Sequence, residues 1–568
     1  GATCALMACG ETKYEVGSYQ VVPLPNEITD AQGVSPFISR SSTTVCYPEG
    51  NEKMERTARF LAQYIRELTG TQVKVGTQGG KNSIQLQLDT TLDNPESYVL
   101  DVTPDGVLLK GATEAAVFIG TQTLYKALPI TEGRALGALP IGTVKDEPRF
   151  PYRGFMIDVG RHFFSVDYLK ELIDIMAMHN INYFHWHLTE DQGWRIEIKK
   201  YPKLTEIGSI RKETITAPGS KEYDGKPVSG FYTQEEAREI VRYAADRFIT
   251  VIPEIDLPGH MMAALASYPE LGCTGGPYEI PTRFGVFDEV LCGGNEQTLQ
   301  FAKDVLNEIM DIFPSPYIHI GGDEAGKVAW RTCPKCQQRM KKEGLKDVNE
   351  LQSYLIHRIE RFLNEKGRKL LGWDEIMEGG LAPNATVMSW RGETGGLKAV
   401  KEGHSAIMTP GTYCYFDNYQ DSPLTQPEAI GGYLPLRKVY DYDPVPAGLS
   451  AEEAALIYGV QANLWAEYIP TDEHYEQMTY PRLLALAEVA WSAPARKSYE
   501  KFHTLALREV EWLQGAGYHP FSLKDEVGER PESVTPLNHK ALGKKVTYNA
   551  PYNNSYKAQG ETALTDGI

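Results

Sequence analysis

The chain has 568 residues, 42% of them hydrophobic, which is more than one ordinary domain contains. Its 57 Lys and Arg residues against 75 Asp and Glu give a formal net charge of −18, which disfavours nucleic acid and anionic lipid surfaces as partners. No apolar run reaches the length of about 18 residues that a transmembrane helix needs, so none is predicted.

The N-terminal segment contains one candidate targeting signal. Leu6-Met7-Ala8-Cys9 resembles the end of a bacterial lipoprotein signal, in which Cys9 would carry the lipid. Four small or apolar residues near a terminus can also occur without any function. Two localisations are therefore predicted: a secreted bacterial protein, or a periplasmic or outer-membrane lipoprotein anchored through Cys9.

Residues 20–147 predict a small α+β domain. Glu52–Leu68 has apolar residues at helical spacing, and a second helix is expected over Ala115–Leu128. Strands are expected at Ile84–Leu88, Tyr98–Thr103 and Val107–Lys110. A Pro-Asp-Gly turn joins the last two strands as a hairpin. Thr143–Pro151, which contains two prolines, is predicted to link this domain to the next.

Residues 148–495 alternate between strand and helix patterns. Eight strands are expected, at Gly154–Val159, Asn182–Leu188, Thr250–Asp256, Tyr317–Gly321, Lys369–Trp373, Thr386–Ser389, Ser405–Thr409 and Ile457–Leu464. Helical periodicity separates several of them, as in Asp167–His179, Glu235–Phe248 and Glu350–Phe362. The predicted fold class is α/β, a (β/α)8 TIM barrel preceded by the small α+β domain. A doubly wound open sheet is the alternative, disfavoured by the lack of a Gly-rich phosphate loop.

Residues 496–568 form a separate C-terminal region. A helix is expected around Lys501–Gly515, and the tail from Val546 has strand-like pieces. We expect the start of a further β-domain there, in a native chain that continues past Ile568.

Carboxylates and aromatic residues recur where the predicted barrel strands end. In a TIM barrel these ends form the functional face. Asp323-Glu324 follows Gly321-Gly322 and an apolar strand, so two adjacent carboxylates are expected at the rim. Adjacent residues point in different directions, so one carboxylate can face a glycosidic oxygen and the other a different substituent. Tryptophan faces stack on pyranose rings, which suits a sugar-hydrolysing cleft.

His185 and His187 could instead begin a metal site on the second strand. Two histidines at i, i+2 share one face of a strand and can bind a metal in a TIM-barrel hydrolase. That chemistry needs further ligands at later strand ends, where tryptophans stand instead. We therefore expect hydrogen-bonded core histidines, and no metal or other cofactor.

The eight cysteines do not form a dense framework. Cys273 and Cys292 bracket a Gly/Pro-rich loop and could pair, and Cys333 and Cys336 form a CxxC motif. A zinc ribbon needs a second such motif at suitable spacing, which the sequence lacks. A local disulfide or two free thiols is therefore expected rather than a metal site.

Over roughly residues 20 to 495 the chain resembles glycoside hydrolase family 20, the β-N-acetylhexosaminidases. The motifs that carry the resemblance are Arg153-Gly154, Asp158 with Arg161-His162-Phe163, His185-Trp186-His187-Leu188, Glu254-Ile255-Asp256-Leu257-Pro258-Gly259-His260, His319-Ile320-Gly321-Gly322-Asp323-Glu324, Trp373-Asp374-Glu375 and Trp465-Ala466-Glu467. No departure from the family pattern is seen at these positions.

The resemblance implies a catalytic set of five residues. Glu324 would be the general acid and base, and Asp323 would orient the 2-acetamido group of the substrate. Tyr415 would donate a hydrogen bond to the acetamido oxygen. Asp191 and His260 resemble the pair that orients the acid.

The resemblance also implies the residues that bind the sugar. Trp373, Trp390 and Trp465 would enclose the acetamido methyl group. Ring hydroxyls of the terminal sugar would be bound by Arg153, Asp417 and Glu467.

The activity implied is that of a retaining exo-β-N-acetylhexosaminidase acting on glycans with a terminal GlcNAc or GalNAc. Such enzymes use the acetamido oxygen as the nucleophile and pass through an oxazolinium ion. Three alternatives stay open: a same-family enzyme that releases a disaccharide, a glycan-binding relative without activity, and the metal-dependent hydrolase. Glu324 argues against the second, because non-catalytic relatives usually lose the acid.

Overall fold

The structure is a computed structural model that describes residues 13–31, 33–528 and 540–547. Cys9 and the tail after residue 547 lie outside the described residues, so the lipid anchor and the further β-domain stay predictions. Within the described ranges, none of the helices combines the length and the apolar character needed to span a bilayer.

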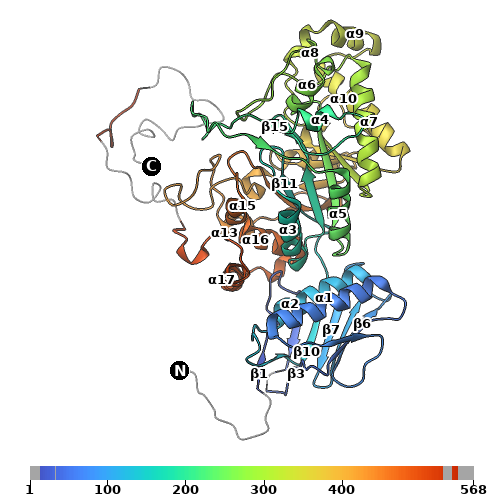
Figure 1. Ribbon diagram of the computed structural model, residues 1–568, viewed down its shortest axis with the longest axis vertical. Coiled ribbons are helices and arrows are strands. Elements are labelled where there is room, and N and C mark those ends of the chain that lie inside the picture. Colours follow the sequence, from blue (N-terminus) through green and yellow to red (C-terminus); the bar gives the residue numbers. More distant parts are fainter. Residues whose placement is uncertain (1–12, 32, 529–539, 548–568) are drawn as a thin grey trace.

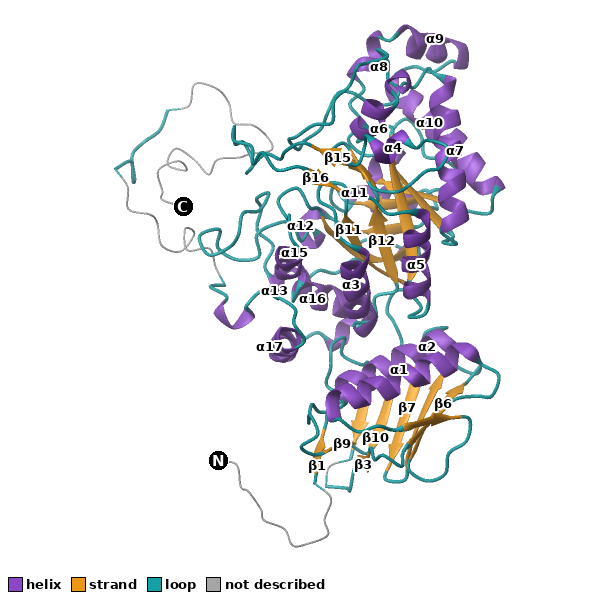
Figure 2. Cartoon of the chain, viewed as in Figure 1, coloured by secondary structure: helices purple, strands orange, loops and turns teal. Residues whose placement is uncertain are grey.

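The N-terminal domain is a sheet covered by two helices on one face (Figure 2). Its seven strands are ordered β2 (Glu27–Asp30), β10 (Gly142–Asp146), β7 (Tyr98–Thr103), β8 (Gly106–Gly111), β6 (Ser83–Leu88), β4 (Thr44–Cys46) and β5 (Lys74–Gly76). A second sheet contains β1 (Tyr14–Val16), β9 (Leu136–Leu139) and β3 (Phe37–Ile38). The predicted hairpin is β7–β8, in which Thr103 is opposite Gly106. The predicted linker is partly wrong, because β10 occupies its first residues.

Helices α1 (Glu52–Thr69) and α2 (Glu114–Ala127) lie between this sheet and the barrel (Figure 1). The Asn51 side chain caps α1 by accepting the Met54 N–H, and Gly70 ends the helix in the left-handed conformation. The buried stripe of α1 packs on the sheet, as its helical spacing predicted.

The second domain is a closed barrel of eight parallel strands, which confirms the predicted TIM barrel. In order around the barrel these are β11 (Tyr152–Asp158), β12 (Tyr183–His187), β17 (Thr250–Leu257), β18 (Tyr317–Gly321), β19 (Lys369–Trp373), β20 (Thr386–Ser389), β21 (Ala406–Met408) and β22 (Ile457–Leu464). Each strand pairs in parallel with the next, and β22 closes on β11.

The outer helices follow the strands with one local exception. They include α3 (Val166–Met178), α5 (Gln234–Ala245), α7 (Glu296–Ile312), α10 (Val348–Glu365), α11 (Thr394–Lys401) and α16 (Arg482–Trp491), with α17 (Tyr499–Gly515) behind them. Between β19 and β20 a single 3-10 turn, Asp374–Met377, replaces the helix. This turn places Glu375 beside the end of β18.

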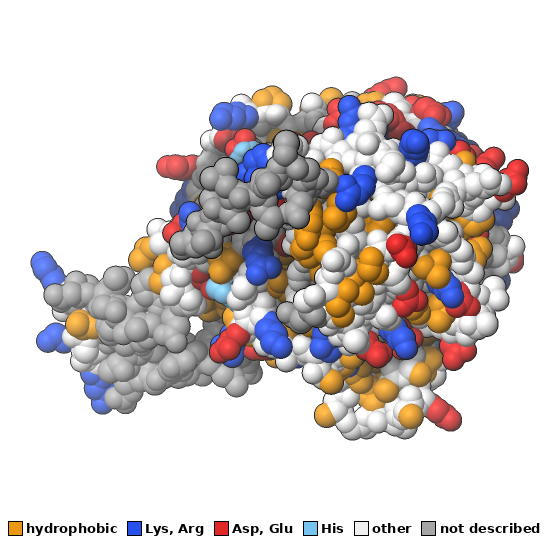
Figure 3. Space-filling view, turned by 90° about the horizontal axis from the view of Figure 1, so that it is seen from below, with side chains coloured by type: hydrophobic (Ala, Val, Ile, Leu, Met, Phe, Trp, Pro, Cys, Tyr) orange, Lys and Arg blue, Asp and Glu red, His pale blue; other side chains and the backbone are white. Residues whose placement is uncertain are grey.

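The barrel interior is layered by polarity. An apolar cluster inside it comprises Tyr152, Ile252, Tyr317, Leu371, Trp373, Met388 and Ile407. Buried histidines and carboxylates follow toward the carboxyl ends of the strands, where the site residues begin. On the outside, acidic and basic side chains are interspersed over the underside of the molecule (Figure 3), so the excess of acid is not gathered on that face.

The position of Arg153 contradicts the prediction that this residue binds ring hydroxyls of the sugar. It is the second residue of β11 and lies at the amino end of the barrel, facing the small domain. Its guanidinium is fully buried and forms an ion pair with Glu96 of that domain, with Nη2 2.5 Å from Oε2. It also donates to the Phe150 and Asn180 carbonyls and lies over the Trp491 ring. Arg153 therefore joins the two domains and does not bind sugar.

Replacing Arg153 by Met should destabilise the protein without affecting sugar binding. The change leaves the largely buried Glu96 carboxylate without its cation, which typically costs about 3 kcal/mol. Urea denaturation should show an earlier unfolding midpoint. In a matched control, Arg59→Met removes an exposed ion pair with Glu55 on α1 and should leave the midpoint unchanged. A reduced affinity for sugar in correctly folded Arg153→Met would contradict this placement.

Candidate active site

A pocket of about 390 Å³ opens at the carboxyl ends of the barrel strands. It is lined by Arg161, Phe284, Gly285, Val286, Asp323, Glu324, Trp373, Trp390, Tyr415, Asp417, Asn418, Ile430, Trp465, Glu467 and Tyr468. The structure thus brings together all of the predicted site residues except Arg153, His260 and Asp191. The last two lie directly behind the pocket wall.

The turn after β18 separates the two adjacent carboxylates. Gly321 and Gly322 have φ of 72° and 89°, and a Cβ atom on Gly321 would lie 1.9 Å from Asp256 Oδ1. Glu324 itself has φ of 46°, and its N–H donates to Glu375 Oε2 at 3.0 Å. As a result the Asp323 side chain is 7% exposed, whereas that of Glu324 is 36% exposed. Glu324 can meet a ligand at the mouth while Asp323 faces the interior.

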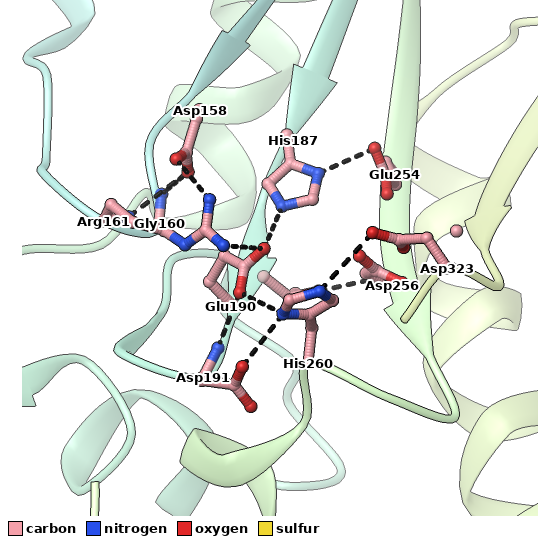
Figure 4. A network of polar contacts seen from close by, with 12 residues as sticks. Asp158, Gly160, Arg161, His187, Glu190, Asp191, Glu254, Asp256, His260 and Asp323 are labelled. Atoms are coloured by element: carbon pink, nitrogen blue, oxygen red, sulfur yellow. Dashed lines mark hydrogen bonds and ion pairs between the residues drawn. The ribbon is translucent and has the colours of Figure 1, made fainter. Parts of the chain in front are cut away.

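His260 connects this turn to the carboxylates behind it (Figure 4). Its Nδ1 lies 2.9 Å from both Asp191 Oδ2 and Glu190 Oε2. Its Nε2 lies 3.2 Å from Glu324 Oε1 and 3.4 Å from Asp323 Oδ2. Burial alone would lower the pKa of His260, but the surrounding carboxylates hold it well above its usual value. His260 is therefore a cation that contacts both carboxylates of the turn.

A second buried cation, His187, lies one step deeper in the network. Its Nε2 is 2.8 Å from Glu190 Oε1, and its Nδ1 is 2.7 Å from Glu254 Oε1. Burial opposes protonation, but the charges of Glu254 and Glu190 raise the pKa of His187 to about 10. The neighbouring His185 contacts Glu254 through Nε2 and accepts from Gln461 through Nδ1.

These contacts bear on the metal-hydrolase alternative. Each ring nitrogen of His185 and His187 already faces a protein partner at 2.9 Å or less. Neither histidine presents a lone pair to the pocket, as a metal ligand at an open catalytic position would. Both histidines are instead buried, as predicted for core histidines; three of their ring nitrogens form hydrogen bonds and His187 Nδ1 forms an ion-pair contact with Glu254.

The aromatic wall is held by hydrogen bonds as well as by packing. The Trp373 and Trp465 rings lie 5.6 Å apart, and Trp390 stacks parallel to Tyr415 at 6.2 Å. Trp373 Nε1 donates to Glu254 Oε2, and Trp390 Nε1 donates to Glu375 Oε1. Burial raises the pKa of Tyr415 well above its usual value, so its hydroxyl stays a hydrogen-bond donor. These rings form a rigid, largely apolar enclosure.

One end of the pocket is polar and contains Arg161, whose guanidinium lies over the Trp465 ring. Its Nη1 lies 3.0 Å from Glu467 Oε1 and 3.1 Å from Asp158 Oδ2, and its Nη2 lies 3.3 Å from Glu190 Oε1. Burial raises the pKa of Glu467 to about 7, and burial together with Glu467 raises that of Asp417 well above its usual value. Arg161, in the loop just after β11, is thus the arginine that lines the pocket, whereas Arg153 does not.

The comparisons with known proteins agree with this geometry. Residues 150–494 match the catalytic domain of glycosyl hydrolase family 20, and residues 18–147 match domain 2 of the same family. The chain belongs to glycosyl hydrolase family 20. It is therefore a glycoside hydrolase, as its motifs indicated.

Relatives in family 20 cover both domains. A β-hexosaminidase of Porphyromonas gingivalis is 47% identical over 514 residues, which are 88% of this chain and 64% of that protein, so the chain spans only part of that relative. The β-N-acetylhexosaminidase of Bacteroides fragilis superposes with a TM-score of 0.76 at 32% identity, covering 90% of this chain and 99% of that one. An exo β-N-acetylglucosaminidase of Vibrio harveyi in complex with N-acetylglucosamine gives a TM-score of 0.78 at 30% identity, covering 91% and 81%.

Sequence reasoning missed the residues that support this family 20 site. Glu375 accepts hydrogen bonds from Glu324 and Trp390, and Glu190 contacts Arg161, His187 and His260. Both were visible as carboxylates at strand ends, Glu190 directly before Asp191 and Glu375 in the same motif as Trp373. Their partners come from other strands, so no spacing in the sequence reveals the contacts.

Asp191→Asn should change the pH profile of the enzyme in a defined direction. The Asp191 carboxylate helps to raise the pKa of His260, so its loss lowers that pKa and the histidine loses its proton at a lower pH. If the cationic form holds Glu324, the alkaline limb of kcat/KM should move to lower pH by on the order of one unit. The measurement is the pH dependence of kcat/KM in both proteins.

The matched control is Asp246→Asn, which removes a surface carboxylate that pairs with Arg56. Its pH profile should overlay that of the parent. An alkaline limb that stays in place in Asp191→Asn, with activity reduced equally at all pH values, would assign Asp191 a purely structural role.

Proposed function

We propose that this glycosidase is a retaining exo-β-N-acetylhexosaminidase that removes terminal GlcNAc or GalNAc by substrate-assisted catalysis. The observation that carries the proposal is the turn after β18, which presents two adjacent carboxylates to one pocket. An ordinary retaining glycosidase needs its nucleophile about 5 Å from the acid, across the scissile bond. Two residues of one turn, both contacting His260, suit an acid and a group that orients the substrate instead.

The proposed steps assign each pocket residue a contact with the substrate. Glu324, at the mouth, protonates the leaving-group oxygen while the acetamido oxygen attacks the anomeric carbon. Asp323 accepts the acetamido N–H and stabilises the positive charge that develops on that nitrogen. Tyr415 donates its hydroxyl hydrogen to the acetamido oxygen. Water activated by Glu324 then opens the oxazolinium ion, with net retention at the anomeric carbon.

The tryptophans support recognition of the acetamido group. Trp373, Trp390 and Trp465 line the same pocket as Asp323 and Tyr415, so a methyl group bound there would be surrounded by aromatic faces. The relative from Vibrio harveyi described above, an exo β-N-acetylglucosaminidase, was solved with N-acetylglucosamine bound, which supports the same substrate class for this chain.

The polar end of the pocket supports release of single sugars. Disaccharide release would need open space beside Asp417 and Glu467, but both side chains are at least nine-tenths buried and Arg161 is bonded to Glu467. Asp417 and Glu467 are therefore proposed to bind hydroxyls of the terminal ring. An assay with an aryl disaccharide should yield the monosaccharide first; direct release of the disaccharide would favour the alternative.

Glu324→Gln should lower the turnover of unactivated glycans by roughly 10²-fold or more, because the glutamine cannot protonate the leaving group. The loss should be smaller for aryl glycosides whose leaving groups need no proton. The control is Glu343→Gln at an exposed glutamate, which should retain full activity. Near-parental hydrolysis of a natural disaccharide by Glu324→Gln would show that Glu324 is not the general acid.

The source of the nucleophile can be tested with modified substrates. Substrates with a 2-hydroxyl in place of the acetamido group should be cleaved very poorly, and a thiazoline that mimics the bicyclic intermediate should inhibit strongly. Asp323→Asn should lower kcat more than it raises KM, because the charge it stabilises develops only along the reaction. Detection by mass spectrometry of a 2-fluoroglycosyl adduct on Asp256, Asp374 or Glu467 would refute the mechanism.

A further inference from the structure

Four cysteines from two separate segments meet beyond the carboxyl ends of the barrel strands. Cys273 and Cys292 lie in the connection between β17 and α7, and Cys333 and Cys336 lie at the start of α9 (Pro334–Glu343). Helices α8 (Val328–Thr332) and α9 lie at the end of the molecule farthest from the small domain (Figure 1). The second cysteine pair that the sequence spacing lacked is thus supplied by folding.

The distances between the sulfurs match a tetrahedral metal site. Cys273 and Cys292 lie 3.8 and 3.7 Å from Cys336, and Cys292 lies 3.8 Å from Cys333; all four sulfurs are within 4.8 Å of one another. Zinc binds thiolates at about 2.3 Å, which places the sulfurs of a tetrahedral Cys4 site about 3.8 Å apart. Of the two outcomes that the sequence left open, a local disulfide or free thiols, the structure shows free thiols at all four positions.

The surroundings suit thiolates rather than four neutral thiols. Cys333 is the N-cap of α9 and Cys336 lies in its first turn, where the helix dipole favours negative charge. The Gly294 N–H donates toward the Cys292 sulfur. A Cβ atom on Gly294 would lie 2.1 Å from the Lys335 backbone, so glycine allows the two segments to pack closely.

We propose that Cys273, Cys292, Cys333 and Cys336 bind a structural zinc ion in a closed Cys4 site. Four thiolates are the ligand set that selects zinc or iron, and they leave no open position for catalysis. Cys292, Cys333 and Cys336 are buried and Cys273 is partly buried, which protects the site from exchange with solvent.

The ion would position a wall of the active site. Residues 274–290 form no helix or strand, and at their base Gly272 pairs with Leu291, whose carbonyl accepts from Trp330 Nε1. Phe284, Gly285 and Val286, within this loop, line the substrate pocket. A metal bound at the loop base and at the segment after β18 reduces the entropy of this long loop. Because the proposed zinc is structural and does not take part in the reaction, a failure of the zinc proposal would leave the proposed reaction unaffected, and the reverse also holds.

The first test is the metal content of the full-length protein purified without a metal-affinity step. Inductively coupled plasma mass spectrometry should find about one zinc per chain, and X-ray absorption should show about four sulfur ligands near 2.3 Å. Zinc-free protein would overturn the proposal, whether alkylation and mass analysis then found four free thiols or two disulfides. Bound iron in place of zinc would overturn the assignment of the metal.

The second test uses variants with a matched control. The double variant Cys333→Ser, Cys336→Ser should lose the zinc, whereas Cys414→Ser, at a buried free cysteine outside the cluster, should retain it. Removing zinc from the parent protein should expose the loop to trypsin at Arg283 and lower the melting temperature. If the double variant fails to fold, X-ray absorption of the parent protein still shows whether zinc is bound by sulfur ligands. Full zinc content in a folded double variant would refute the site.

Discussion

The active site depends on the compensation of buried negative charge. Buried carboxylates at the carboxyl ends of most barrel strands converge at the pocket and behind it, and in a low-dielectric interior they would repel one another strongly. Three cations between them, Arg161, His187 and His260, make this convergence stable. Because each cation contacts carboxylates from more than one strand, the network also fixes the relative positions of the strand ends.

That rigidity is consistent with the two roles proposed for the turn after β18. His260 contacts both Asp323 and Glu324, while Glu375 accepts the Glu324 N–H and holds its left-handed backbone. The same Glu375 accepts a hydrogen bond from Trp390, so Glu324 and one wall of the aromatic enclosure are held by the same side chain. A change behind the pocket therefore reaches the reacting groups through short, charged contacts rather than through loop motion.

The outer wall of the pocket is built differently. The loop of residues 274–290 is long and irregular. At its tip Phe284 packs on Tyr468 and His162 and lies under the Arg211 guanidinium, and the carbonyls of Thr282 and Arg283 accept hydrogen bonds from the Ile215 N–H and the Gln192 side chain. A cross-link at its base supplies order that regular secondary structure does not. In this view the inner wall is held by buried charges and the outer wall by the four cysteines.

The sequence alone determined the order of elements and most of the pocket. Apolar periodicity located the eight strands, and barrel topology then required that Asp323, Glu324 and the three tryptophans meet at one rim. It did not distinguish Arg153 from Arg161, because Arg153 lies at the start of β11 and Arg161 in the loop just after it, so that only the direction of the strand separates the domain junction from the pocket. Nor could spacing reveal that Cys273 and Cys292 join Cys333 and Cys336. Contacts between segments distant in sequence are set by how the loops pack over the barrel, and the tertiary structure alone decides them.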